Sequence, residues 1–393
     1  MRDPIVIVGT ARTPMGGFQG DLAPQTAAQL GGVAIRGALA SAQLDAEQVN
    51  EVIMGCVLSA GQGQAPARQA SVAAGIPFAT GCTTINKMCG SGMKATMFAH
   101  DLLAAGSAEV MVAGGMESMS NAPYLLNKAR DGLRMGHGQV LDHMFLDGLE
   151  DAFDKSRLMG TFAEDTAEHY QFTREAQDAF AIRSLRRAQR ATEEGRFSAE
   201  ITPVTVSARR QSYEVTIDEQ PAKANLDKIP TLKPAFRADG TVTAANSSSI
   251  SDGAAALVLM RASQAQKRGL TPRARIVGHS TFAQEPAWFT TAPVHAINNL
   301  YERIGWTRDD VDLYEINEAF AVVTMAAIHE LGLDEERVNI NGGACALGHP
   351  IGASGARILV SLLAALEHQG VQRGIAALCI GGGEATAMAI ERI

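Results

Sequence analysis

The sequence AALCIGGGE occupies residues 376–384, where an apolar run ends in a cysteine, three glycines and an acidic residue. A similar sequence, VMVAGGME, occupies residues 110–117. Each follows an apolar helical pattern that opens on a turn of small residues, GSGMK at 90–94 and ASGAR at 353–357. Because the spacing from the turn to the acidic residue is similar in both places, we predict an internal duplication, with two related halves facing each other. Chance similarity between glycine-rich turns is the alternative.

The residues around the first copy alternate between short apolar runs and helical patterns. The short runs predict strands, and the patterns with a period of 3.6 residues predict helices. Alternation of this kind indicates α/β layers with a mostly parallel sheet. The predicted strands are Ile5–Val8, Val52–Cys56 and Val110–Ala113, and the predicted helices are Thr26–Ala40 and Gly92–Ala105.

The middle of the chain is richer in charge and in irregular sequence than the rest. It contains one clear helical pattern, at Arg174–Arg190, and an irregular stretch at Arg209–Lys228. We interpret it as an inserted loop domain, since insertions of this kind often carry substrate-binding loops. The predicted division is an N-terminal α/β half at 1–120 that is completed by 251–270, the insertion at 121–250, and a C-terminal α/β half at 271–393.

Composition excludes several classes of protein. A chain of 393 residues that is 46% hydrophobic and 19% charged has the make-up of a soluble globular protein with a large core. The net charge of −8 argues against nucleic acid as the main partner, and no apolar run reaches the length of a membrane span. Five cysteines in so long a chain fit free thiols in a reducing compartment better than a disulfide framework. With no signal peptide in view, we expect a cytoplasmic protein without a membrane partner.

Cys89 stands in the sequence NKMCGSG, at residues 86–92, between a strand-like run and the predicted helix. A thiol just before a helix N-terminus lies at the positive end of the helix dipole, which favours the thiolate. Small neighbours leave room for a bulky thioester. Cys89 is therefore a candidate nucleophile, with a buried structural cysteine as the alternative.

His349 and Cys379 are the other two groups with acyl-transfer chemistry. His349 is held between Gly348 and Pro350, and its imidazole can take a thiol proton and later hold an oxyanion. Cys379 ends an apolar run, so its thiol can move a proton to or from carbon or sulfur, and the N–H of a following glycine can donate to an oxyanion. Two thiols and an imidazole in glycine-rich turns predict acyl transfer by a cysteine nucleophile.

Asn317 follows the predicted strand Val311–Ile316 and opens the sequence NEAF. An amide at a strand end can position a water in a site. A helix N-cap is the alternative, and the two roles are compatible.

Two other kinds of site compete for the same motifs. A metal site built from Cys89, His349 and Cys379 would lack a C-x-x-C pair. A dinucleotide-binding oxidoreductase would use the glycines at 381–383, but these lack the G-x-G-x-x-G spacing and an adequate helix start. Both therefore rank below acyl transfer.

The chain resembles the thiolase family, and most closely its short-chain biosynthetic members, in several motifs that occur in the family's order. The motifs are TARTP at 10–14, NKMCGSG at 86–92, GGMESMS at 114–120, NEAF at 317–320, NGG at 341–343, GHPIGASG at 348–355 and CIGGG at 379–383. The resemblance runs from end to end. It implies an α/β fold in which duplicated βαβαβαββ halves form a layered α-β-α-β-α core with an inserted loop domain.

The resemblance also implies a role for each candidate residue. Cys89 would be acylated by an acyl-CoA, and His349 would take its proton and contribute to an oxyanion hole. Cys379 would remove a proton from the methyl group of a second acetyl-CoA, and would return it in the cleavage direction. Asn317 would hold a water that completes the first oxyanion hole, and the N–H groups of Cys89 and Gly381 would form the second.

Coenzyme A contacts follow from the same resemblance. Ser248 matches a serine that contacts the pantetheine arm, Leu149 matches an apolar residue lining its channel, and Met159 and Phe289 belong to the same region. CoA and acyl-CoA would be substrates, so no metal or redox cofactor is expected. The segment Asn121–Met144 looks like a tetramer-forming loop, which implies a homotetramer built as a dimer of dimers.

Two departures from the family pattern bear on the substrate. Leu158 stands where biosynthetic thiolases commonly carry a histidine, and Cys345 replaces an aliphatic residue.

We expect reversible condensation of two acetyl-CoA, or thiolysis of a short-chain 3-ketoacyl-CoA, through a Cys89 acyl-enzyme. The alternative within the family is a degradative thiolase for longer or 2-methyl-branched substrates. A CoA- or lipid-binding protein without turnover is the alternative outside it, but such a protein would have no need for Cys89, His349 and Cys379 together.

Overall fold

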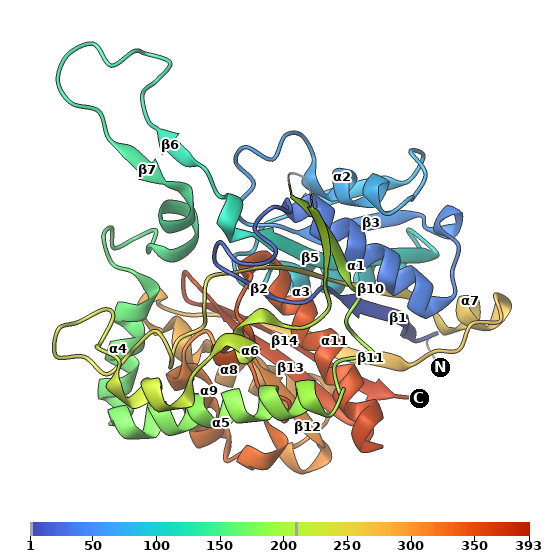
Figure 1. Cartoon of the computed structure of the whole chain (residues 1–393). Helices are drawn as coiled ribbons and strands as arrows, with labels where there is room; N and C mark the ends of the chain where they lie inside the picture. Colours follow the sequence, from blue (N-terminus) through green and yellow to red (C-terminus); the bar gives the residue numbers. More distant parts are fainter. Residues whose placement is uncertain (1–2, 209–210) are drawn as a thin grey trace.

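The computed structural model describes residues 3–208 and 211–393, and its centre is a large mixed sheet with helices on both faces (Figure 1). The strands of this sheet are β1 (Ile5–Arg12), β2 (Gly16–Gly17), β3 (Glu51–Gly55), β4 (Gly81–Ile85), β5 (Val110–Ser118), β10 (Ser251–Arg261), β11 (Ala274–Ala283), β12 (Leu313–Ile316), β13 (Arg373–Ile380) and β14 (Glu384–Arg392). Nine of them lie in the order β12-β13-β14-β11-β1-β10-β5-β3-β4, and β2 pairs with β10.

The strand order shows the duplication. The N-terminal strands run β4-β3-β5-β10-β1, and the C-terminal strands run β12-β13-β14-β11. Val338 forms a parallel bridge to Tyr314 of β12. This bridge occupies the position in the C-terminal half that β4, paired in parallel with β3, occupies in the N-terminal half. The two halves join where β1 pairs with β11. The same topology therefore occurs twice, which confirms the predicted pair of related halves.

The sheet is less parallel than the sequence predicts. The pairs β3–β4, β3–β5 and β12–β13 are parallel, while β1–β10, β10–β5, β11–β14, β13–β14 and β1–β11 are antiparallel. The reason is that each half ends with a strand that returns beside its predecessor, as the tight connection from β13 to β14 shows. The expectation of a mostly parallel sheet was therefore wrong.

Helices complete five layers. The helices are α1 (Ala27–Ala42), α2 (Pro66–Ala73), α3 (Ser91–Ala105), α4 (Met159–Tyr170), α5 (Arg174–Glu193), α6 (Glu219–Lys223), α7 (Ala262–Lys267), α8 (Ala292–Ile304), α9 (Ala321–Leu331), α10 (Ala344–Leu347) and α11 (Ile351–Gln369). Helices α1 and α2 cover the outer face of the N-terminal strands, and α8 and α9 cover that of the C-terminal strands. Helices α3 and α11 pack on each other between the two sets of strands. This arrangement confirms the predicted α-β-α-β-α core.

Small residues allow the two central helices to touch. A Cβ on Gly355 of α11 would lie 2.5 Å from the backbone nitrogen of Met93, and a Cβ on Gly92 of α3 would lie 2.8 Å from that of Ala356. Both distances are shorter than van der Waals contact permits, so each helix needs glycine where it meets the other. The small residues at 90–94 and 353–357, which indicate the duplication in the sequence, are thus the residues through which the two central helices touch.

Helix α11 is the one described helix that is long and apolar enough to cross a membrane by length and composition, although Arg357 and Glu367 interrupt its apolar residues. Its mean hydropathy over the most apolar window is 1.2, and 89% of that window is buried inside the protein. Its apolar residues belong to the central layer, where both sets of strands cover them.

The segment between β5 and β10 lies outside the layered core. It contains a hairpin, β6 (Tyr124–Leu126) and β7 (Val140–Asp142), that projects from the body (Figure 1), and a second hairpin, β8 (Val204–Ala208) and β9 (Gln211–Val215). Residues 209–210 lie outside the described residues, but the rest of the stretch predicted as irregular contains β9 and α6, so that expectation was wrong there. We retain as a proposal the division into 1–120 with 251–270, 121–250 and 271–393.

Candidate active site

One cavity of about 470 Å³ collects the candidate residues from both halves of the chain. Cys89 comes from the N-terminal half, and His349, Cys379 and Gly381 come from the C-terminal half. Asn317 lies behind His349 and does not line the cavity. The further lining residues named in the sequence analysis are Leu149, Leu158, Met159, Ser248 and Phe289.

The turn from β4 to α3 presents Cys89. Met88 has a positive φ of 46°, which turns the chain sharply, and Gly90 is the N-cap of α3. Burial raises the pKa of the Cys89 thiol to about 11, while the backbone N–H groups of Gly381 and of Cys89 itself act in the opposite direction. The helix dipole was expected to favour the thiolate, but burial outweighs it here, so the free thiol is protonated at neutral pH. A base is therefore needed to activate it.

His349 is built to be that base. Its Nδ1 lies 2.5 Å from Ser354 Oγ, and this hydroxyl donates in turn to the carbonyl oxygen of Pro350 at 3.0 Å. The hydroxyl thus accepts from Nδ1–H, which leaves a lone pair on Nε2. Among the described residues Nε2 has no hydrogen-bond partner. Burial, and then the charge of Arg357, lower the pKa of His349 to about 3, so the imidazole is neutral.

Cys379 lies near the end of β13 and is fully buried. Burial, followed by the charge of Cys89, raises the pKa of its thiol well above the ordinary value. It belongs to a buried apolar cluster that also contains Phe162, Val242 and Phe320. Cys379 is therefore protonated at rest, as a proton donor must be.

Asn317 lies beside the cavity-lining His349 and contacts the buried Arg357–Glu315 ion pair. Its Nδ2 lies 3.5 Å from His349 Nδ1, and its Oδ1 accepts from Arg357 at 3.5 Å. Arg357 also pairs with Glu315 at 3.4 Å. The N-cap of α9 is Phe320, so the capping role considered for Asn317 is excluded.

Glu117 is a buried group that the sequence analysis quoted in a motif but gave no role. Its carboxylate accepts backbone N–H groups from Val57 at 3.0 Å, Leu58 at 3.1 Å and Gly352 at 2.9 Å. Burial raises its pKa to about 7, against the effect of these hydrogen bonds. It ties the loop after β3 to the first turn of α11, three residues after His349.

The sequence analysis also gave no role to Ser354 and Arg357, although both lie in the quoted ASGAR motif.

An ion pair joins the two cysteine motifs across the halves. Lys87, two residues before Cys89, pairs with Glu384, at the end of the glycine turn that follows Cys379. Both side chains are partly buried. The pair holds the turn carrying Cys89 against the turn carrying Gly381, whose N–H faces the Cys89 sulfur.

The far wall of the cavity is apolar. A Cβ at Gly381 would lie 3.2 Å from Met159 Sδ, so the Met159 side chain would have to shift slightly to admit one. Phe289 is buried and packs edge-on against Phe162, with ring centroids 6.3 Å apart. Leu158, which stands where a histidine was expected from the family pattern, adds another apolar side chain to this wall.

Comparison with known proteins assigns both parts of the chain. The family model "Thiolase, N-terminal domain" matches residues 5–263, and "Thiolase, C-terminal domain" matches residues 270–392. An acetyl-CoA acetyltransferase of Pseudomonas aeruginosa is 49% identical over 99% of each chain. A cytosolic acetyl-CoA acetyltransferase of Mus musculus is 49% identical over 99% of this chain and 98% of the relative.

Two solved structures share the fold along the whole chain. An acetyl-CoA acetyltransferase of Bacillus anthracis superposes with a TM-score of 0.97, at 42% identity, over 100% of this chain and 99% of the other. A thiolase of Ascaris suum in complex with coenzyme A superposes with a TM-score of 0.93, at 42% identity, over 99% and 100% of the two chains.

Proposed function

The chain belongs to the thiolase family, and on that premise we propose that it is an acyltransferase that condenses two acetyl-CoA into acetoacetyl-CoA and CoA, and catalyses the reverse cleavage. Relatives that are almost half identical from end to end carry the name acetyl-CoA acetyltransferase. The single observation that carries the proposal is that Cys89, His349 and Cys379 meet at one cavity.

The first half-reaction transfers an acetyl group to Cys89. Nε2 of His349 takes the thiol proton, and the sulfur bonds to the carbonyl carbon of acetyl-CoA. The carbon–sulfur bond to CoA then breaks, and the CoA thiolate takes the proton of the Cys379 thiol, which leaves Cys379 as a thiolate while His349 keeps the proton of Cys89. The role of Asn317 stays a proposal: the family resemblance assigns it a water of the first oxyanion hole, and its amide lies 3.5 Å from His349 Nδ1.

The second half-reaction makes the carbon–carbon bond. The Cys379 thiolate removes a proton from the methyl group of a second acetyl-CoA, and the resulting carbanion attacks the acetyl group on Cys89. The bond to Cys89 sulfur breaks, and that sulfur takes the proton that His349 holds, while Cys379 keeps the proton of the methyl group. Because burial keeps the Cys379 thiol protonated at rest, this thiolate forms only when Cys379 gives its proton to the departing CoA in the first half-reaction.

The N–H groups of Cys89 and Gly381 suit the developing oxyanion. Both already act on the Cys89 sulfur, where they favour negative charge. Backbone donors held by a rigid turn need no rearrangement as charge develops on a substrate oxygen beside them.

We propose that coenzyme A and its thioesters lie against Ser248, Leu149, Met159 and Phe289, all of which line the cavity. Coenzyme A would be a substrate, with no further cofactor. We also propose a cytoplasmic homotetramer, for which the exposed apolar residues of the β6–β7 hairpin supply a surface, among them Tyr124 with 68% of its area exposed.

One observation favours a second candidate substrate class. Leu158 makes the cavity wall apolar at the position where biosynthetic members commonly carry a histidine. A longer or 2-methyl-branched 3-ketoacyl chain would gain contact there. This degradative activity is the alternative.

The test is the CoA-dependent loss of acetoacetyl-CoA, followed by its enolate absorbance, beside 3-ketohexanoyl-CoA and 2-methylacetoacetyl-CoA. Fast cleavage of acetoacetyl-CoA with slow cleavage of the others supports the proposed function. Preference for the longer or branched substrate supports the degradative alternative. Absence of turnover on all three, with CoA still bound, would make the protein a binding scaffold.

A further inference from the structure

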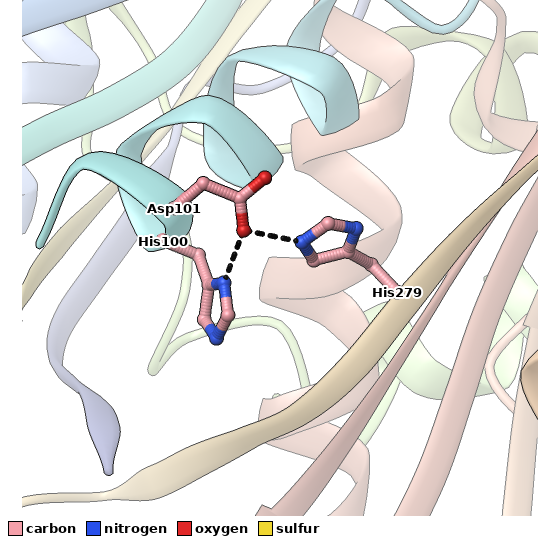
Figure 2. Close-up of side chains that lie close together, drawn as sticks. All are labelled: His100, Asp101 and His279. Carbon is pink, nitrogen blue, oxygen red and sulfur yellow. Dashed lines mark hydrogen bonds and ion pairs between the residues drawn. The ribbon is translucent and has the colours of Figure 1, made fainter. Parts of the chain in front are cut away.

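A cluster of two histidines and an aspartate lies away from the catalytic cavity. His100 and Asp101 lie on α3, and His279 lies on β11; none of the three is among the described residues that line the cavity. Figure 2 shows both imidazole rings directed at the same carboxylate oxygen. We propose that these three side chains bind one divalent transition-metal ion of the zinc, cobalt, nickel or copper group.

The distances between the three ligand atoms are close to those in a metal site. Asp101 Oδ1 lies 2.9 Å from His100 Nδ1 and 3.0 Å from His279 Nε2. All three ligand atoms lie within 4.8 Å of one another. Zinc bonds to imidazole nitrogen and carboxylate oxygen are about 2.0–2.2 Å long and point to the corners of a tetrahedron, so neighbouring ligand atoms are separated by about 3.4 Å. The two imidazole–carboxylate distances are within about 0.5 Å of that separation.

The rings are held in complementary orientations. Their centroids are 5.1 Å apart and their planes make an angle of 88°. His279 is on an extended strand with 10% of its side chain exposed, and His100 is on a helix with 21% exposed. Ligands fixed on regular elements lose little freedom when an ion binds. The Asp101 side chain is 58% exposed, which leaves a route for the ion and room for water as a further ligand.

The ligand types select the class of ion. Two imidazole nitrogens and one carboxylate oxygen suit zinc, cobalt, nickel and copper, whereas magnesium and calcium prefer sites made of oxygen alone. The metal would replace the hydrogen bonds that His100 Nδ1 and His279 Nε2 now make with Asp101 Oδ1. Each imidazole would bind the ion through the nitrogen that now faces the carboxylate.

Two cationic side chains lie near the cluster. On β11 and α8, Arg303 donates to the carbonyl oxygen of His279 at 3.0 Å, and on α3 Lys94 lies close enough to interact with Asp101. These two cations oppose an incoming ion. Asp101, whose side chain is 58% exposed, is the acidic ligand that would offset them.

The position of the cluster predicts its effect. Helix α3 begins at the turn that carries Cys89, and the cluster lies about 15 Å further along it, given a rise of 1.5 Å per residue. Strand β11 belongs to the other half of the duplication. A bound ion would thus link the two halves at a distance from the chemistry, and it should raise the melting temperature without entering the reaction.

The experiment is a titration of the metal-free full-length protein with Co²⁺ alone, followed by absorption and by calorimetry. The background variant carries Cys89→Ala and Cys379→Ala, so that the catalytic thiols cannot bind the probe. We expect one ion per chain, visible d–d bands, and none of the near-ultraviolet charge-transfer bands that thiolate ligands produce.

Matched variants decide the assignment. Asp101→Asn and His100→Asn should each weaken Co²⁺ binding at least about tenfold, and His279→Asn should do the same. His368→Asn, which changes an exposed histidine at the end of α11, should leave it unchanged. If His279→Asn fails to fold, the two variants on α3 carry the test, since Asp101 is exposed. Unchanged affinity in the Asp101 and His100 variants, or no binding up to millimolar Co²⁺, would overturn the proposal.

Discussion

At the scale of single residues, the site depends on a neutral imidazole with a defined tautomer. Ser354 accepts the Nδ1–H of His349, and burial keeps the ring uncharged, so Nε2 is left with a lone pair facing the reaction. A protonated thiol on one side and a free lone pair on the other make an acid–base pair that becomes charged only when substrate arrives. Ser354 acts through His349 and is a positioning residue.

Ser354→Ala should lower kcat for acetoacetyl-CoA thiolysis about tenfold, the effect expected from losing one hydrogen bond of 1–2 kcal/mol, with KM little changed. The reason is that His349 loses the partner that fixes its tautomer. Steady-state kinetics check this. Ser354→Thr should restore most of the activity, because it keeps the hydroxyl. Ser361→Ala, another buried serine of α11, is the control, and an equal loss of kcat there would contradict a specific role for Ser354.

The raised pKa of Cys89 predicts how its reactivity changes with pH. The thiolate fraction of a group with a pKa of about 11 rises tenfold for each pH unit up to that value. The rate of iodoacetamide alkylation of Cys89, measured by mass spectrometry in Cys379→Ala, should therefore rise through pH 7, 8 and 9 without levelling. A plateau below pH 8 would show that the thiolate already predominates at neutral pH and would contradict the assignment.

At the scale of elements, the site is placed by the contact between α3 and α11. Cys89 precedes one of these helices and His349 precedes the other, so the depth of their packing sets the distance between nucleophile and base. Glu117 adds a second tie, from the loop after β3 to the start of α11. The catalytic geometry is thus a property of helix packing more than of any one loop.

Gly355→Ala should destabilise the protein by about 1–3 kcal/mol, the usual cost of overpacking a core. The added Cβ would meet the backbone nitrogen of Met93 at 2.5 Å, and backbone cannot move aside as a side chain can. Urea unfolding checks the change. Gly81→Ala is the control, because a Cβ there has its nearest neighbour 3.8 Å away. Equal stability of the two variants would mean that the helices separate without cost.

At the scale of the whole molecule, much of the fold could be predicted from the sequence. The repeated apolar-run-and-glycine motif predicts two related halves, and the structure contains them. The direction of the strands could not be predicted in this way, because an apolar run looks the same in a parallel and in an antiparallel pair. The hairpin β8–β9 was missed since its strands are polar and exposed on one face.

The candidate site shows the same division. Cys89, His349 and Cys379 stand out because reactive side chains in glycine-rich turns are unusual, and the structure gathers them at one cavity. Ser354, Arg357 and Glu117 act through burial and through contacts between distant segments, which no local pattern reveals. The roles assigned to the site residues stay predictions.

Assembly is a property of the whole molecule that the exposed hairpin makes testable. Replacing Tyr124, Leu126 and Val140 of β6 and β7 by serine removes apolar side chains that are largely exposed in the single chain. We expect the proposed tetramer to become smaller, as measured by light scattering, with kcat per chain retained. An unchanged mass would show that the hairpin does not join subunits.

The most direct test of the account is the mass of the protein after brief exposure to acetyl-CoA. We predict one added acetyl group on Cys89, absent in Cys89→Ala and retained in Cys379→Ala, while the latter condenses poorly. Acetylation of Cys89→Ala at the native rate would contradict the nucleophile assignment, and near-normal condensation by Cys379→Ala would contradict the second thiol's role as acid and base.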